Sequence, residues 1–434
     1  MLANAAQRGN TSMFIVNRVE LLEQTAKAFD QLDIGYGLVA AGFTPNYGAP
    51  VQISSIDTLK RRLDKVRPPK IIVWDECRSL GAKGWTEVYK YFPDALHMGL
   101  DATPIRLDGT GLDKYFTELI LGPSYSELQA RGALVPFDVY APGTPDMSGV
   151  HTKQGDFDQT EVAEIMDKPA LVGDVVDHYL RHARGKLGIT FAVNRKHSEH
   201  LAAQYRQAGI PAEHLDGDTD KAERVAKVAA FRRRQIHVLC NVNLFSAGFD
   251  VPGVEVITDC APTQSLAMFL QRAGRGSRPE PSIGKTRCLL LDHAGNVFRH
   301  GLPDQDREWT LQGREKGKKK KAEDSVAIRQ CEVCFAVFSP APVCPQCGHV
   351  QAVKNRELEE REGELAKITP EMIAAAKVAK KIEVARAGSL DALRAIEVER
   401  GYRQGWSDNV WAARQKGAER RFEGQAAAYR AGRW

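Results

Sequence analysis

The chain has 434 residues, of which 43% are hydrophobic and 26% charged, and its formal net charge is +5. This length suffices for two or three domains, and the composition is ordinary for a globular protein. No apolar run approaches the roughly 20 residues that a bilayer span needs, and the first ten residues do not resemble a signal peptide. We therefore expect a cytoplasmic protein without a membrane partner. The mild basicity permits nucleic-acid binding, but an ordinary basic surface explains it equally well.

Short apolar runs alternate with helical patterns from residue 13 to residue 135. The segment "MFIVN" reads as a strand, "RVELLEQTAKAFDQL" as a helix, and "KIIVWDE" as another strand. The same rhythm restarts after about residue 169. Such alternation predicts an α/β fold with mainly parallel sheets, here two domains in tandem. The Gly-, Pro- and Asp-rich stretch at 142–158 predicts a loop between them.

Two adjacent acids, Asp75 and Glu76, follow the apolar run 71–74. In open parallel sheets, ligands bind beyond the carboxyl ends of the strands. An Asp at such an end can hold Mg²⁺, and the Glu beside it can position or deprotonate an attacking water. The alternative is a pair of solvated acids at the start of a helix, where negative charge is favoured.

Three later segments place polar residues at similar turns. The segment "GLDATPIR" at 99–106 follows a strand, and "NVNLFSAGFDVPGVEVI" at 241–257 has a polar loop between two strands. The segment "FLQRAGRGSRP" at 269–279 carries Gln271, Arg272, Arg275 and Arg278 at near-helical spacing. Arginines on one face of a helix repel one another unless an anion neutralises their charge. Triphosphate is a suitable anion, because its oxygens form bidentate hydrogen bonds with guanidinium groups.

In this order, the segments resemble the motifs of the superfamily two helicases, the DEAD/DEAH-box group. "DECR" at 75–78 is similar to motif II, and "DATP" at 101–104 to motif III, with Asp101 where Ser is usual. Further similarities are "FIVNRVELLEQT" to motif Ia, "VQISSIDTL" to Ib, "ITFAVNRKHSEHL" with "HLDGDT" to IV, "LFSAGFDVP" to V and "QRAGRGSRP" to VI. The resemblance covers about residues 1–300. The cysteine cluster that follows resembles the RadD-like bacterial and phage members.

The resemblance implies ATP and Mg²⁺ as cofactors and assigns roles to individual residues. Asp75 would be the Mg²⁺ ligand and Glu76 the catalytic base, while Arg275 and Arg278 would be arginine fingers from the second domain. The other implied cofactor-binding residues are Gln271 and Arg272, on the phosphate side or in the coupling, and Gly248 and Asp250, beside the nucleotide sugar and the domain cleft.

The resemblance also implies a nucleic-acid partner, DNA rather than RNA. It assigns Arg18 of motif Ia to the nucleic-acid backbone and Thr103 of motif III to the nucleic-acid side. Motif II departs from the family at two positions, with Cys77 for Ala and Arg78 for His. That His normally links hydrolysis to motif III, so the family's coupling does not carry over at this position.

A helicase of this family needs a glycine-rich loop, G-x-x-x-x-G-K-[ST], whose amides and Lys bind phosphate. No such segment precedes motif Ia. The one Gly-Lys-Thr, at 284–286, has Pro279 where the first Gly would be and a strand after it, so we interpret it as a turn. We expect the chain to begin just past the loop, with the first domain N-terminally incomplete.

Four of the eight cysteines form two CxxC knuckles, nine residues apart: Cys331, Cys334, Cys344 and Cys347. Four thiolates at this spacing predict a closed tetrahedral Zn²⁺ site. Disulfides and an Fe–S cluster are the alternatives, and a cytoplasmic chain disfavours disulfides. Cys77, Cys240, Cys260 and Cys288 are scattered, and we expect them to be free thiols, mostly buried in or beside strands.

The predicted organisation is two tandem RecA-like domains, a small zinc ribbon and a helical C-terminal tail. The expected boundaries are 1–137, 138–305, a basic linker at 306–329, the ribbon at 330–350 and a basic helical region at 351–434. The predicted function is an ATP-dependent helicase or translocase core in DNA replication, recombination or repair, with replication or repair proteins as further partners. If the gene belongs to a phage, the host cytoplasm is the expected location. The alternative is an N-terminally truncated, ATPase-dead, nucleic-acid-binding fragment.

The C-terminal segment mixes Arg with aromatic residues. Trp406 and Trp411 are candidates for base-stacking platforms. Packing among the terminal helices is the alternative, and we favour it.

Overall fold

The computed structural model describes residues 2–17, 19–106, 108–143, 145–153, 155–242, 251–313, 328–350, 383–399 and 405–415. The chain forms two units, Met1–Val353 and Lys354–Trp434. Arg18, Gly248 and Asp250 lie outside the described residues. Among the helices of the described ranges, none combines the length and the apolar character that crossing a membrane requires.

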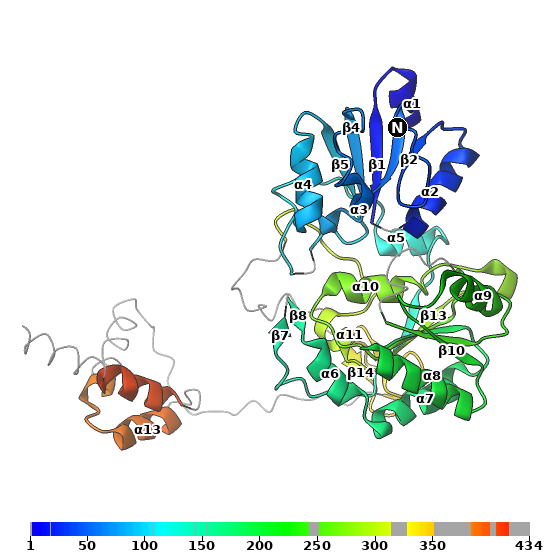
Figure 1. Cartoon of the computed structure of the whole chain (residues 1–434). Helices are drawn as coiled ribbons and strands as arrows, with labels where there is room; N and C mark the ends of the chain where they lie inside the picture. Colours follow the sequence, from blue (N-terminus) through cyan, green and yellow to red (C-terminus); the bar gives the residue numbers. More distant parts are fainter. Residues whose placement is uncertain are drawn as a thin grey trace, which may run out of the picture. The chain divides into compact units, whose positions relative to one another are not determined.

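The first sheet has five parallel strands in the order β2-β3-β1-β4-β5 (Figure 1). Helices α1 and α2 pack on one face through Leu2, Leu22 and Phe29, and α4 packs on the other through Trp85 and Val88. The bounds are α1 Leu2–Gln7, β1 Ser12–Val16, α2 Val19–Gln31, β2 Gly37–Val39, β3 Val51–Ser55, α3 Ile56–Leu59, β4 Ile71–Asp75, η1 Cys77–Ser79, α4 Lys83–Tyr91 and β5 Leu96–Leu100.

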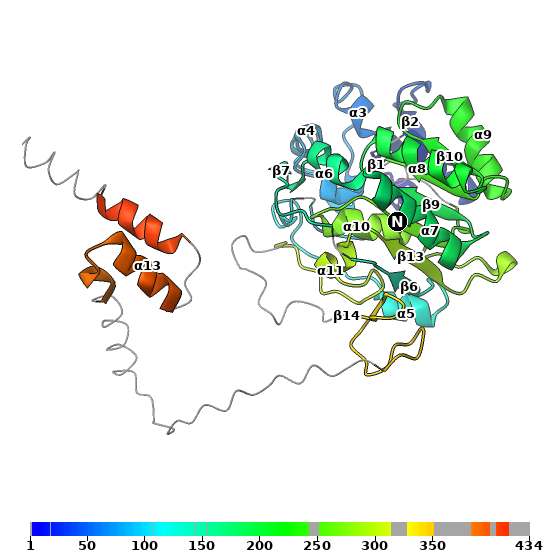
Figure 2. The same cartoon turned by 90° about the horizontal axis from the view of Figure 1, so that it is seen from below.

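The second sheet has eight strands in the order β10-β11-β9-β12-β13-β6-β15-β14. Helices α7 and α8 cover one face and α9 and α10 the other, as the two core clusters and Figures 1 and 2 show. The bounds are α5 Tyr125–Ala130, β6 Phe137–Tyr140, α6 Gln159–Met166, α7 Pro169–Ala183, β9 Gly188–Phe191, α8 Arg195–Gln207, β10 Ala212–Leu215, α9 Lys221–Arg232, β11 Val238–Asn241, β12 Val256–Asp259, α10 Leu266–Gly274, η3 Pro281–Ile283, β13 Cys288–Asp292, α11 Asn296–His300, β14 Arg329–Gln330 and β15 Ala336–Phe338.

The four-cysteine segment is part of the second sheet. Strand β15 pairs antiparallel with β6, with Ala336 opposite Tyr140, whereas β6 pairs parallel with β13. Phe137, expected as the last residue of the first domain, is the first residue of β6, so the second sheet begins one residue before the expected boundary.

The stretch expected to be a loop at 142–158 contains a short hairpin, β7 (Thr152–Lys153) with β8 (Asp156–Phe157). The Asp156 carboxylate accepts hydrogen bonds from the Thr263 hydroxyl and from the Gln264 N–H. These two hydrogen bonds attach the hairpin to the segment between β12 and α10 of the second sheet.

The first residues of the expected linker pack against the first sheet. The Leu112 N–H donates to the Leu311 carbonyl at 2.6 Å, and Leu311 packs against the first sheet's core. A Cβ on Gly111 would lie 2.0 Å from that carbonyl oxygen, so only glycine allows this approach. The chain therefore returns from the second sheet to the first before residue 314.

In the C-terminal unit, the described elements are α13 (Leu390–Glu399) and helical residues 383–386 and 406–415. Trp406 and Trp411 pack against a small buried cluster, Ala387, Leu393 and Ile396. The structure thus places both tryptophans in helix packing. The helical pattern at 355–382 lies outside the described residues.

Candidate nucleotide site and metal centre

The buried strand β4 delivers Asp75 to the carboxyl end of the first sheet. Ile72, Val73 and Trp74 are at most 2% exposed, which holds the strand in the core. Glu76 then adopts a left-handed conformation (φ 54°, ψ 48°) before the short helix η1. This conformation costs roughly 1–2 kcal/mol for a residue with a Cβ, and such strained residues cluster at functional sites.

Arg78 joins motif II to motif III. Its guanidinium forms ion pairs with the carboxylates of Glu76 and Asp101 and donates a 3.1 Å hydrogen bond to the Thr103 hydroxyl. The backbone N–H of Arg78 also donates a hydrogen bond to Asp101 Oδ2 at 2.9 Å. The two side chains in the second ion pair are 8% and 1% exposed, so this contact is sheltered from solvent.

The two acids of motif II are half-buried and share a negatively charged setting. Burial raises the pKa of Asp75, and the charge of Asp101 raises it further. Burial likewise raises the pKa of Glu76, while the positive charge of Arg78 opposes this. Within the described chain, Asp75 forms no ion pair. A half-buried carboxylate in this position fits a divalent cation, which takes oxygen ligands.

Helix α10 of the second sheet reaches Glu76. Gln271 Nε2 donates to Glu76 Oε2 at 3.1 Å, although the two residues belong to different sheets. The pKa of Glu76 is raised by burial, and the positive charge of Arg275, like that of Arg78, opposes this rise. Arg278, three residues further, has an exposed side chain. The structure therefore brings together Asp75, Glu76, Gln271 and Arg275 from the sequence-predicted set.

Arg272 points into the second sheet's core and not toward Glu76. It is 4% exposed, donates to Asp259 Oδ1 at 3.2 Å and to the Ala261 carbonyl at 2.6 Å, and its guanidinium lies 5.9 Å from the Phe191 ring centroid. Asp259 is fully buried at the end of β12, so it needs this cation. The structure gives Arg272 a structural partner where the sequence predicted a cofactor contact.

Thr103 also differs from its expected place. It is 3% exposed, and its hydroxyl hydrogen-bonds with Arg78 and Asp101, so it faces the interior and not a nucleic-acid surface. The residues that sequence reasoning did not assign are Arg78 and Asp101. The sequence did contain a signal for this pair. Arg78 adds a cation to motif II and Asp101 adds an acid to motif III, and both differ from the usual family residues.

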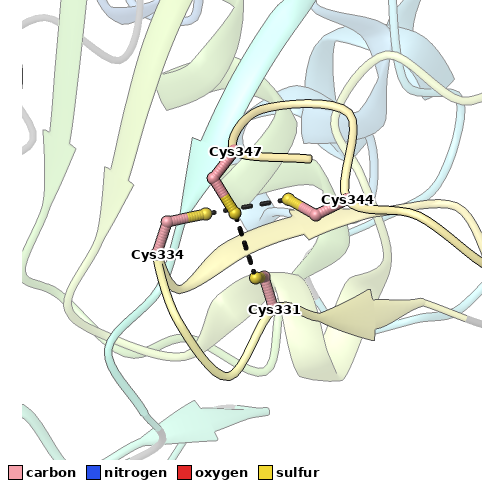
Figure 3. Close-up of side chains that lie close together, drawn as sticks. All are labelled: Cys331, Cys334, Cys344 and Cys347. Atoms are coloured by element: carbon pink, nitrogen blue, oxygen red, sulfur yellow. Dashed lines mark hydrogen bonds between the residues drawn. The ribbon is translucent and has the colours of Figure 1, made fainter. Parts of the chain in front are cut away.

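The four clustered cysteines converge on one point (Figure 3). The Sγ atoms of Cys331 and Cys347 are 3.6 Å apart and those of Cys334 and Cys344 are 3.7 Å apart, and all four lie within 4.8 Å of one another. A tetrahedral ion with Zn–S bonds of about 2.3 Å gives S···S edges of roughly 3.8 Å. The distances far exceed the roughly 2.05 Å of a disulfide, so the donor set fits Zn²⁺.

The other four cysteines are buried free thiols, as predicted. Cys77 is 4% exposed and Cys240, Cys260 and Cys288 are 0% exposed. Burial raises the pKa of Cys77, Cys240 and Cys288 to about 12. A thiol that stays protonated at neutral pH is a poor nucleophile and a poor metal ligand.

Two family models match the chain, one for each sheet. Residues 1–106 match the type III restriction enzyme res subunit, and residues 168–280 match the helicase conserved C-terminal domain. A 51.5 kDa protein of a Lactococcus phage is 31% identical over 374 residues, covering 85% of this chain and 78% of the phage protein.

The mitochondrial ATP-dependent helicase irc3 of Schizosaccharomyces pombe is 27% identical over 58% of this chain and 43% of its own length, so the chain spans less than half of that relative. Among solved structures, an HsdR subunit fragment of a type I restriction enzyme from Vibrio vulnificus has a TM-score of 0.52 at 19% identity, covering 67% of this chain and 54% of the fragment. That likeness concerns the fold, and it agrees with two tandem RecA-like domains. The chain belongs to the superfamily two helicases of the DEAD/DEAH-like group.

Proposed function

We propose that this chain is the motor core of an ATP-dependent DNA helicase or translocase that acts in replication, recombination or repair. One observation carries the proposal: Gln271 of the second sheet hydrogen-bonds Glu76 of the first. The contact joins motif VI to motif II. Residues from both sheets can therefore contact a group bound at the end of β4. Hydrolysis and relative movement of the two sheets can therefore be linked.

In the proposed mechanism, Glu76 accepts the proton of the attacking water, and Gln271 holds its carboxylate in place. Arg275 and Arg278 stabilise the negative charge that develops on the transferred phosphoryl group. Asp75 would hold Mg²⁺, which neutralises phosphate charge when bound. The partial burial of Asp75 and Glu76 strengthens each of these electrostatic interactions.

Arg78 supplies the coupling that the family assigns to a His. Its guanidinium binds Glu76 on one side and Asp101 with Thr103 on the other. A displacement of the motif III turn therefore moves a cation that touches the catalytic base. Arg78 acts through Glu76 and is a positioning residue in this scheme.

The choice of DNA rests on the relatives. One of the two family models names a restriction enzyme, and a type ISP restriction-modification enzyme solved bound to DNA has a TM-score of 0.50 over 67% of this chain, at 14% identity. Zn²⁺ at the four cysteines would have a structural role, because four thiolates leave no open position for chemistry.

A second candidate function is nucleic-acid binding without hydrolysis. The 434 residues contain no G-x-x-x-x-G-K-[ST] segment, and hydrolysis in this family needs that loop to orient the triphosphate. Nucleic-acid binding does not depend on the loop.

ATP hydrolysis separates the two candidates. We expect residues 1–434 alone to hydrolyse ATP very slowly, with or without single-stranded DNA. The same chain joined to an upstream phosphate-loop segment should show DNA-stimulated turnover, and Glu76→Gln should lower that turnover about 10²- to 10⁴-fold without changing DNA affinity. Glu87→Gln, an exposed acid in α4, is the matched control and should leave it unchanged. Fast turnover by residues 1–434 alone would contradict the need for the loop, and an inactive extended chain would favour the binding-only candidate.

A further inference from the structure

A small pocket lies at the carboxyl edge of the second sheet, beside the zinc ribbon. Its volume is about 240 Å³, and its walls come from the ends of β6 and β13, from the last half of α7 and from the first cysteine knuckle. This volume is below the roughly 300–1,000 Å³ of pockets for drug-sized ligands, so it suits a single ring. The carboxyl edge of a parallel sheet is also where such folds bind ligands.

Aromatic and imidazole rings dominate the pocket. Tyr140 and His182 are stacked with ring centroids 4.5 Å apart, and His178 and His293 are stacked at 5.1 Å. Arg181, which is exposed, also lines the pocket. Flat rings offer stacking faces to a planar ligand, and a guanidinium at the rim offers a contact to phosphate.

His293 lines the pocket and carries one buried hydrogen-bonding atom without a partner among the described residues. Its side chain is 8% exposed, and within the described structure its Nε2 atom has no hydrogen-bond partner. Burial lowers the pKa of His293 to about 3, so the ring is neutral at physiological pH. A neutral imidazole nitrogen accepts or donates one hydrogen bond, depending on the tautomer. Buried polar atoms are normally satisfied, so an unpartnered atom in the pocket wall favours a ligand with a polar edge.

Phe335 adds an aromatic ring at a conformational cost. It follows the second cysteine of the first knuckle with φ 60°, and Gly348 follows the second cysteine of the other knuckle with φ 72°. Gly adopts this region freely, whereas a bulky residue there is strained. The Phe335 ring is nevertheless 44% exposed, so core packing does not account for it. Retaining Phe where the matching knuckle has Gly indicates a use for the ring.

We propose that this pocket captures one unstacked base of a single-stranded nucleic acid, which stacks on the rings of Phe335 and Tyr140 and hydrogen-bonds through its polar edge to His293, while Arg181 contacts the adjoining phosphate. The inference rests on the proposed function, because it needs a nucleic-acid strand on the second sheet. It assigns that strand a path past the zinc ribbon. A planar aromatic side chain of a protein partner is the competing occupant, but it brings no phosphate for Arg181 to contact.

The test compares oligothymidylate with an abasic strand of the same length, which keeps the phosphates and lacks the bases. Wild-type protein should bind the oligothymidylate about tenfold more tightly, the size of one stacking contact. Phe335→Gly should remove most of that preference, leave affinity for the abasic strand unchanged and keep zinc content and thermal stability at or above wild type, because Gly relieves the strain. Phe298→Ala, at another exposed Phe of the same unit, is the control and should change nothing. His293→Leu gives a second variant that should also reduce the preference.

The outcomes separate this inference from the proposed function. If wild-type protein binds neither strand, the proposed function fails. If it binds both strands equally, or if Phe335→Gly keeps the full preference, the pocket is not a base site. Binding of an aromatic peptide with unchanged oligothymidylate affinity in Phe335→Gly would assign the pocket to a protein partner and overturn the proposal.

Discussion

Arg78 and Asp101 are the residues whose roles the structure changes most. Each departs from its family motif, and together they form a buried ion pair at the end of β4 and β5. Asp101 alone would be a buried acid with no cation, and Arg78 alone would be a buried cation. Replacing one partner of such a pair leaves an uncompensated charge, which is strongly destabilising. The two departures therefore make physical sense only as a pair.

A double-mutant cycle tests this pairing. We expect Arg78→Ala to lower the free energy of unfolding by about 3–5 kcal/mol, because Asp101 stays buried without its cation. Asp101→Ser should be destabilising for the converse reason, and the double variant should lose clearly less than the sum of the two. Arg61→Ala is the control. Arg61 is exposed and follows α3, so this change should alter the unfolding free energy by less than about 0.5 kcal/mol. Additive losses in urea unfolding would show that the two residues act independently.

Residue spacing predicted the arginines of motif VI but not their directions. Arg272 and Arg275 are three residues apart, which places two residues on one face of a helix. Helix α10 ends at Gly274, and Arg275 is its C-cap residue, still in the right-handed helical conformation. Arg272 remains on the core face and meets Asp259, whereas the charge of Arg275 acts on Glu76. The buried partners of Arg272, Asp259 and the Ala261 carbonyl, lie outside the helix, so helical spacing alone could not predict which arginine reaches the site.

At the scale of elements, the alternating pattern was sufficient to predict two mainly parallel sheets, and the structure confirms them. The attachment of the ribbon was not predictable. Strand β15 has three residues, too few for a periodic signal, and its partner β6 lies almost 200 residues earlier. Antiparallel pairing of a short strand at a sheet edge depends on tertiary contacts that no local pattern encodes. The ribbon thus covers an edge that would otherwise expose unpaired backbone groups.

Zinc removal tests the ribbon as an element. The purified chain should hold about one Zn²⁺, and Cys344→Ser should release it, because three thiolates no longer close the tetrahedral site. Hydrogen exchange should then rise at residues 329–350, including β14 and β15, while β4 and β12 stay protected. Cys240→Ala, at a buried thiol outside the cluster, should retain the metal. Metal analysis that finds no zinc in freshly purified wild-type protein would rule out this site.

For the whole molecule, the sequence motifs predicted that two sheets face a common site, and the Gln271–Glu76 hydrogen bond agrees with this. The return of residues 306–313 to the first sheet was not predictable, because that segment reads as a charged linker. Its contact depends on Gly111, where the absence of a side chain lets the Leu311 carbonyl approach. The two sheets are therefore connected both by the chain between them and by this second crossing. Any relative movement of the sheets must include residues 306–313.

Salt dependence tests nucleic-acid binding by the whole chain. Phosphate contacts release counterions, so the logarithm of the binding constant should fall by about 0.7 per contact for each tenfold rise in salt on a single strand. For about five contacts, affinity should drop about 100-fold between 50 and 200 mM salt. Arg18→Ala, which removes the contact expected from motif Ia, should reduce the slope by about 0.7, whereas Arg131→Ala, at an exposed Arg after α5, should not. Fluorescence anisotropy with labelled DNA and RNA strands of one sequence measures these affinities.

An affinity that does not change with salt would contradict phosphate binding. Equal affinity for both strands would remove the case for DNA, because the 2′-hydroxyl and not the phosphate distinguishes RNA from DNA.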